Sequence, residues 1–184
     1  MSHFRHILAI GACVIALSAC SAQQSYRSFD LSIYRLAPGD AIRLRVFDQE
    51  PISGEYAVAT DGAVSVPLVG RVRVKGLSVN QVESRIRGRL TSSGVIVEPR
   101  LSVEVARYRP YYVHGEVGAS GQFPFVAGLT IEKAIAAAGG FTKFASKRRF
   151  KVVREERGEL VTLSLTSLDM VKPGDTITVS ERFL

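Results

Sequence analysis

The residues of this chain that could perform chemistry are few and scattered. Asp48, Glu50 and Glu55 fall in or beside one predicted loop, without the apolar surroundings that would set a glycosidase acid–base pair apart. His114 is the one histidine beyond the first residues, and a single histidine is more often a packing or hydrogen-bonding residue than a metal ligand. The sequence shows no phosphate-binding loop and no nucleophile–base set. We therefore predict no catalytic residue, no metal site, no cofactor and no enzymatic activity.

A second group of candidate residues is cationic. Arg71, Arg73 and Lys75 alternate with Val72 and Val74, so all three project from one face of a predicted strand. This face could contact an anionic polymer or a neighbouring subunit, and a solvated strand face is the alternative. We retain the three residues as candidate polymer or subunit contacts.

Two further groups of cations are associated with the predicted helices. Arg85 and Arg89 lie one turn apart on the first helix and could face solvent or a subunit. Five cations follow the second helix and could meet anionic lipid head groups or an acidic partner, or form a solvated loop. They are Lys143, Lys147, Arg148, Arg149 and Lys151.

Turn carboxylates and a group of tyrosines admit structural and functional interpretations. Asp40 and Asp175 each follow Pro-Gly, where an Asp side chain usually bonds the nearby backbone, although a subunit or ligand contact is the alternative. Tyr108, Tyr111 and Tyr112 could stack on sugar rings or pack at a junction between domains.

The first residues have the layout of a secretory leader. A largely apolar run occupies residues 7–19, too short for a membrane-spanning helix, and ends in Leu17-Ser18-Ala19-Cys20 before a polar stretch. This arrangement resembles a bacterial lipobox, so we predict cleavage before Cys20 and lipidation of its thiol. An ordinary signal peptide with a chance cysteine and a buried N-terminal helix are the alternatives. An exported protein is not expected to bind nucleic acid, despite the formal net charge of +7.

Composition and length agree with a folded, exported protein. The chain has 184 residues, of which 46% are hydrophobic, enough for one or two packed domains. Its two cysteines cannot form a disulfide framework.

Hydrophobic patterning divides the remainder into two blocks. In the first block, Ser78 and Gln81 form a capping box at the start of a helix, which ends at Ser92-Ser93-Gly94. Strands are predicted at residues 42–46, 56–59, 63–66, 71–75, 95–97 and 101–105, the second and third forming a hairpin around Asp61-Gly62.

The second block follows Arg109-Pro110. Thr130 caps a predicted helix over residues 131–138, and Gly139-Gly140 stops it. Strands are predicted at residues 111–117, 122–126, 149–154, 160–165 and 176–179. Short strands around one helix per block predict an α+β class with two small domains.

Several motifs in order resemble a known family. YRLAPGD (34–40), VATDG (58–62) and VPLVGRV (66–72) resemble the polysaccharide biosynthesis/export domain of outer-membrane polysaccharide export lipoproteins. VHGEV (113–117), AAAGGF (136–141) and the closing PGD (173–175) resemble the β-grasp soluble-ligand-binding (SLBB) domain that follows it. The resemblance implies a leader (1–19), a tether (20–30), an export domain (31–108) and one β-grasp SLBB domain (109–184).

The resemblance also implies a function and partners. The expected protein is a capsule or exopolysaccharide export component on the periplasmic face of the outer membrane, anchored through lipidated Cys20. The expected partners are identical subunits in a ring, an inner-membrane polysaccharide co-polymerase and the exported polysaccharide. Larger relatives carry a membrane-crossing helix after the SLBB domains, so a separate outer-membrane pore protein is expected here. The alternative is a periplasmic β-grasp lipoprotein that binds a soluble ligand or cell-wall glycan without forming a conduit.

Overall fold

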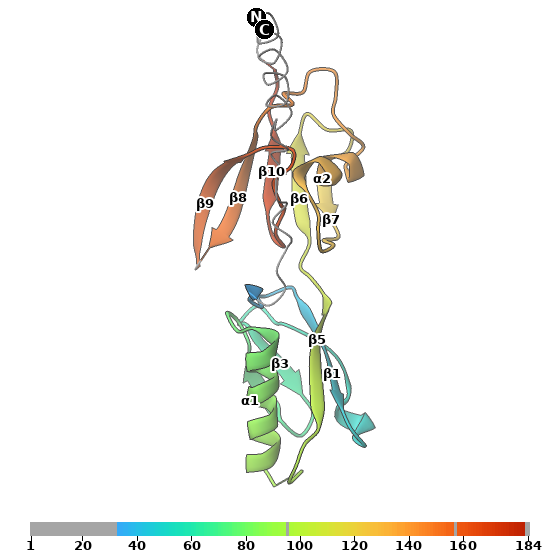
Figure 1. Ribbon diagram of the computed structural model, residues 1–184, viewed down its shortest axis with the longest axis vertical. Coiled ribbons are helices and arrows are strands. Elements are labelled where there is room, and N and C mark those ends of the chain that lie inside the picture. The colour runs from blue at the N-terminus through green and yellow to red at the C-terminus, as the bar shows by residue number, and fades with distance from the viewer. Residues whose placement is uncertain (1–32, 95, 157, 183–184) are drawn as a thin grey trace, which may run out of the picture.

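Two lobes stacked along one long axis make up the protein (Figure 1). The computed structural model describes residues 33–94, 96–156 and 158–182. Each lobe contains one α-helix and its own strands, and the chain passes between the lobes after β5 (Leu101–Arg107). The predicted α+β class with two small domains is confirmed. The leader and the lipidation prediction at Cys20 lie outside the described residues.

The first lobe is built on a three-stranded antiparallel sheet with the order β2-β1-β5. Alternation along β1 (Ala41–Val46) places Ile42, Leu44 and Val46 in the core and Arg43 and Arg45 on the opposite face. The other elements are η2 (Glu50–Ile52), β2 (Gly54–Ala57), β3 (Ala63–Val66), β4 (Gly70–Arg73) and α1 (Val79–Ser92).

The helix of the first lobe begins at the capping box that the sequence predicts. The Ser78 hydroxyl accepts from the Gln81 N–H at 3.4 Å, and the Gln81 side chain accepts from the Ser78 N–H at 2.9 Å. Val82, Ile86 and Leu90, spaced four apart, are fully buried. This face anchors α1 on the core of the lobe.

Two strand predictions in the first lobe are wrong. The chain does turn at Asp61-Gly62, but β2 pairs with β1 and β3 pairs with β4, so no hairpin joins β2 to β3. Residues 96–100 are irregular rather than a strand, and Val97 is 83% exposed. Pro99 lacks an N–H for a strand ladder, and α1 extends to Ser92, which leaves only a short connection to β5.

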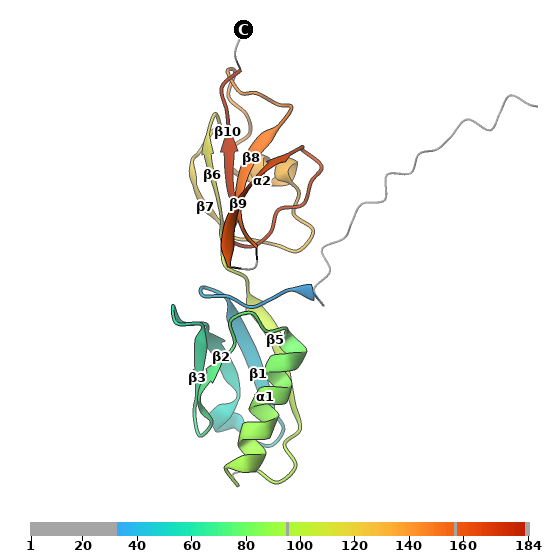
Figure 2. The same cartoon turned by 90° about the vertical axis from the view of Figure 1, so that its left-hand side faces the viewer.

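The second lobe has a five-stranded mixed sheet with the order β7-β6-β10-β8-β9. Strand β10 runs parallel to β6 at the centre, the other pairs are antiparallel, and α2 covers one face (Figure 2). This is the expected β-grasp-like arrangement, and the predicted hairpin between β8 and β9 is confirmed. The elements are β6 (Tyr111–Gly115), β7 (Gly121–Phe123), α2 (Ile131–Ala137), β8 (Phe150–Glu156), β9 (Glu159–Leu165) and β10 (Thr176–Val179).

Each lobe has its own hydrophobic core, and the two cores meet at one residue. Tyr108 packs against both clusters. Its ring lies edge-on to Tyr34 at a centroid distance of 5.0 Å and edge-on to Phe125 at 5.4 Å. The junction-packing interpretation of Tyr108 is therefore confirmed.

Candidate functional site

The cationic strand of the first lobe has the predicted alternation. Val72 and Val74 are fully buried, while Arg71, Arg73 and Lys75 are exposed. Strand β4 ends at Arg73, so Lys75 continues the same face from the following turn. The structure thus places the three candidate residues together, and their role in contacting a polymer or a subunit stays a prediction.

Two of these cations are paired and one is not. Arg71 pairs with Asp61, in the turn that precedes β3. Lys75 lies 3.8 Å from the Glu155 carboxylate of β8 and thereby links the two lobes. Arg73 has no ion pair with any residue that the structure describes, so its charge is available to a ligand or partner.

The helix arginines belong to the same surface. The Arg85 guanidinium donates to the Arg73 carbonyl at 2.8 Å, and the Arg89 guanidinium donates to the Arg71 carbonyl. These two carbonyls lie on the side of β4 that faces away from β3, so the arginines cap an edge that would otherwise be open to another strand. We call Arg71, Arg73, Lys75, Arg85 and Arg89 the basic surface.

The sequence did not predict that the two groups of arginines meet. Helical spacing placed Arg85 and Arg89 one turn apart, and strand alternation placed Arg71 and Arg73 on one face. Their contact depends on how α1 packs beside β4, which is a tertiary feature with no local signal.

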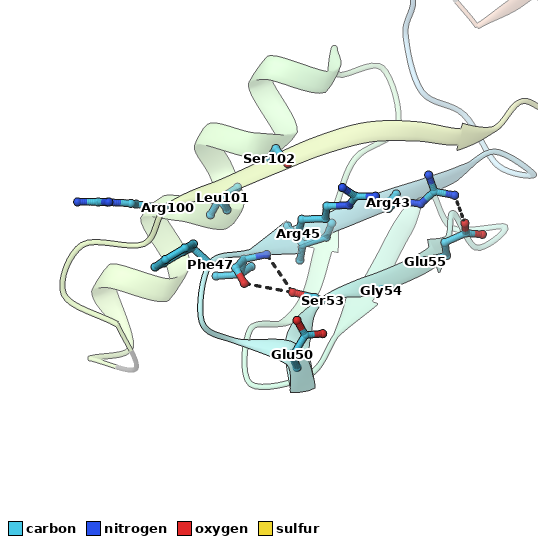
Figure 3. A pocket seen from close by; sticks show the side chains of 12 residues that line it. Arg43, Arg45, Phe47, Glu50, Ser53, Gly54, Glu55, Arg100, Leu101 and Ser102 are labelled. Atoms are coloured by element: carbon cyan, nitrogen blue, oxygen red, sulfur yellow. Dashed lines mark hydrogen bonds and ion pairs between the residues drawn. The ribbon is translucent and has the colours of Figure 1, made fainter.

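A groove of about 620 Å³ lies on the outer face of the first lobe's main sheet (Figure 3). Arg43 donates to the Glu55 carboxylate at 2.6 Å, and this carboxylate raises the pKa of Arg43. Among the described residues, Arg45 and Arg100 have no ion pair. Glu50 and Glu55 both line the groove and are exposed, so neither has the apolar burial that would tune a carboxylate for acid–base catalysis.

The two Pro-Gly-Asp turns hold buried carboxylates. Asp40 accepts from the Ala37 N–H at 2.8 Å and from the Tyr34 hydroxyl at 2.7 Å. Asp175 accepts from the Lys172 N–H at 2.7 Å and from the Arg154 guanidinium at 2.7 and 2.8 Å. The interpretation of both residues as turn-stabilising carboxylates is confirmed.

Arg109 connects these two turns across the junction between the lobes. Its N–H donates to Asp40 at 2.8 Å, and its guanidinium lies 3.6 Å from the same carboxylate. A Cβ added at Gly174 would lie 2.5 Å from Arg109 Nε, so the side chain packs closely on the second turn. Burial, followed by the nearby Asp40 charge, raises the pKa of Tyr34, which keeps its hydroxyl protonated as a donor to Asp40.

The remaining candidate residues, Tyr111, Tyr112 and His114, lie on the sheet of the second lobe. Tyr111 is buried and stacks on Phe123 at a centroid distance of 5.8 Å, whereas Tyr112 is 42% exposed. His114 is exposed, with Nε2 3.0 Å from the Thr178 hydroxyl. The described part of the chain contains no cluster of metal-ligating side chains. It also contains no helix that is long and apolar enough to cross a membrane.

Comparison with known proteins agrees with the motifs. Residues 30–106 match the family model described as polysaccharide biosynthesis/export protein, and residues 110–163 match the SLBB domain. The two matches occur in the same order as the motifs along the sequence.

Curated relatives carry names from exopolysaccharide production and export. The chain is 34% identical to the exopolysaccharide production protein ExoF of Rhizobium meliloti over 128 residues, covering 64% of this chain and 30% of ExoF. It is 29% identical over 157 residues to the EPS I polysaccharide export outer membrane protein EpsA of Ralstonia nicotianae, covering 78% and 40%. The Ralstonia solanacearum EpsA is 30% identical over 134 residues, covering 71% and 34%. The chain therefore spans between 30% and 40% of the length of these relatives.

Proposed function

We propose that this chain is a non-enzymatic component of an exopolysaccharide or capsule export conduit. The premise is that it belongs to the polysaccharide biosynthesis/export family and carries an SLBB domain. Residues 31–108 would form the export domain and residues 109–184 the SLBB domain. The ordered match of both family models is the observation that carries this proposal. The names of the relatives add support, because they refer to exopolysaccharide production and export.

The proposal includes a location and partners. Lipidated Cys20 would hold the protein on the periplasmic face of the outer membrane, since several acyl chains give firm anchoring. Identical subunits would form a ring, which an inner-membrane co-polymerase would contact from one side. A separate outer-membrane protein would complete the path of the polysaccharide.

Deletion of the gene tests the proposed function. We expect loss of extracellular polysaccharide in the deletion strain and its recovery when the gene is supplied in trans. Normal polysaccharide output in the deletion strain would contradict an export role. A chain that remains monomeric in mild detergent, with its lipid retained, would instead favour the alternative of a ligand-binding lipoprotein.

The exposed charges of the basic surface give a sharper prediction. Replacing Arg71, Arg73 and Lys75 together with Glu should strongly reduce polysaccharide output in the complemented strain, because an anionic polymer or an acidic subunit edge would then be repelled. The exposed positions of these side chains allow the change without disturbing the core.

A charge-retaining variant is the matched control. Arg71→Lys, Arg73→Lys and Lys75→Arg alter the same three positions but keep their charge, and should retain output. Immunoblots must show equal protein levels for both variants. Full output from the Glu variant at normal protein level would identify this surface as a solvated face.

A further inference from the structure

The end of the second lobe that lies away from the first lobe is strongly basic. It is formed by the connection from α2 to β8, the segment after β10 and the turn after β6 (Figures 1 and 2). We call this region the distal tip. Among the described residues, six cations and two carboxylates lie there. The carboxylates are Glu116 and Glu181, and the cations are Lys143, Lys147, Arg148, Arg149, Lys151 and Arg182.

The cations of the distal tip are not neutralised by the carboxylates that the structure describes. None of the six forms an ion pair with a residue that the structure describes. Glu116 accepts a hydrogen bond from the Thr142 hydroxyl, so one of the two carboxylates already has a partner within the lobe. In the first lobe some arginines are paired with a carboxylate, among them Arg43, Arg71 and Arg87. The distal tip therefore has positive charge available for an external anionic surface.

An aromatic side chain projects among these charges. Phe144 is 52% exposed, and the Lys143 ammonium lies 4.9 Å from its ring centroid. A second ammonium, that of Lys147, lies 5.5 Å from the ring of Phe141, which is itself stacked on the buried Phe150. An exposed aromatic ring flanked by cations is the combination found where proteins contact the interface of a bilayer.

The backbone holds Phe144 in this exposed position. Its carbonyl accepts from the Arg182 N–H at 2.7 Å, and its own N–H donates to the Thr142 hydroxyl at 3.3 Å. The next residue, Ala145, is buried, and the Ser146 N–H donates to the Ser180 carbonyl at 2.9 Å. These bonds fix the direction in which the Phe144 side chain leaves the backbone, so its exposure is a property of the fold.

We propose that the distal tip docks onto a bilayer surface that carries anionic phospholipid, with Phe144 inserted between the head groups and the surrounding cations bound to phosphates. The inference rests on the membrane-anchored location in the proposed function. Each Lys or Arg near such a surface contributes attraction, and the aromatic ring adds burial of apolar area. Docking at one end of the long axis would hold the molecule upright, with the first lobe directed away from that membrane.

The absence of tryptophan from the chain allows a direct test. Phe144→Trp places a single tryptophan in the full-length protein, which is reconstituted into phosphatidylcholine vesicles with or without phosphatidylglycerol. We expect a blue-shifted emission and quenching by lipids brominated in their acyl chains when phosphatidylglycerol is present. Phe47→Trp is the matched control, because Phe47 is 66% exposed in the first lobe and its replacement should stay unquenched.

Charge reversal in the Phe144→Trp protein tests the electrostatic part of the proposal. Lys143→Glu, Lys147→Glu and Arg148→Glu should abolish the quenching, since the loss of three cations weakens surface attraction on the order of a hundredfold. The equivalent reversal of Arg71, Arg73 and Lys75 changes the net charge equally and should leave the quenching intact. Circular dichroism checks the fold of every variant.

Three outcomes would overturn the proposal. An unquenched indole in the Phe144→Trp protein would show that the distal tip faces water or a protein partner. Equal quenching of the Phe47→Trp and Phe144→Trp proteins would show that the molecule lies flat. Quenching that persists after charge reversal would exclude recognition of anionic lipid. Polysaccharide output of the deletion strain is a separate measurement, so failure of docking and failure of the export role can be told apart.

Discussion

Asp175 and Arg154 form the most deeply buried ion pair among the described residues. The Asp175 carboxylate is fully buried and the Arg154 side chain is 9% exposed. The pair is bidentate, and Arg154 also donates to the Met170 carbonyl at 3.0 Å. The Lys172 N–H binds the same carboxylate, so one Asp side chain fixes both the turn and the arginine of β8.

Removing the Asp175 charge should therefore be costly. Asp175→Asn leaves the Arg154 guanidinium without its buried counter-charge, and we expect a loss of about 3–5 kcal/mol in the free energy of unfolding. Urea denaturation followed by circular dichroism measures the change.

Glu156→Gln is the control for this prediction. Glu156 lies 4.0 Å from Arg154 and 3.2 Å from Lys172, but its side chain is 45% exposed. Solvent screens such a pair, so the expected loss is under about 1 kcal/mol. Equal losses in the two variants would mean that burial does not determine the strength of these pairs.

The sequence predicted the two turns but not the partners of their carboxylates. Pro-Gly-Asp is a local signal, and the bonds from Ala37 to Asp40 and from Lys172 to Asp175 stay within it. Arg109 is 69 positions from Asp40, and Arg154 is 21 positions from Asp175. Pairs this distant are determined by the packing of whole strands, which no short pattern encodes.

At the scale of elements, α1 carries a residue that weakens it. Gly88 lies in the interior of α1, and a Cβ added there would meet no atom within 4 Å. Glycine in a helix interior costs stability because it loses more backbone freedom on folding than alanine. Open space beside Gly88 means that this cost can be removed without steric conflict.

Gly88→Ala should raise the free energy of unfolding by about 0.5–1 kcal/mol. Gly118→Ala is the opposite case, because its added Cβ would lie 2.7 Å from the Gly139 carbonyl oxygen. The second variant should lose about 1–3 kcal/mol through overpacking. Thermal melting of both proteins checks that Gly88→Ala raises stability and that Gly118→Ala lowers it. A destabilised Gly88→Ala protein would contradict the open surroundings of this glycine.

The elements that the sequence predicted best are those with two independent signals. For α1, the capping box and the four-residue apolar spacing agree, and the helix begins where they indicate. The Asp61-Gly62 pair indicated a turn correctly, but turn chemistry alone does not choose the strand partners. The Gly62 carbonyl instead accepts hydrogen bonds from the N–H groups of Val74 and Lys75, and these bonds connect the turn to the end of β4.

At the scale of the whole molecule, one short connection determines how the lobes are held. Tyr108 contacts both cores, and Arg109 lies between the turns at Asp40 and Gly174. The Gly174 N–H also donates to the Pro110 carbonyl at 3.0 Å. Tyr108 and Arg109 thus contact both lobes and Pro110 bonds to the second, so the junction is a fixed joint rather than a free linker.

Arg109→Ala should loosen this joint. The substitution removes the guanidinium that faces Asp40 and packs on Gly174, while the backbone bond from residue 109 to Asp40 can remain. Removing this ion partner of the buried Asp40 carboxylate should cost about 1–3 kcal/mol, so local opening should become at least about fivefold more frequent. Chymotrypsin cleavage after Tyr108, identified by fragment mass and expressed relative to the urea-unfolded chain, measures the opening.

Two variants decide what the arginine contributes to the joint. Arg107→Ala changes an exposed arginine on the neighbouring β5 and should leave cleavage after Tyr108 unchanged. Arg109→Lys keeps the charge near Asp40 but loses the planar group that packs on Gly174, so its cleavage rate should fall between those of the wild type and Arg109→Ala. If Arg109→Ala resists cleavage as well as the wild type, the contacts of Tyr108 with the two cores suffice to hold the lobes. In that case the close packing of Arg109 on Gly174 would follow from the joint rather than maintain it.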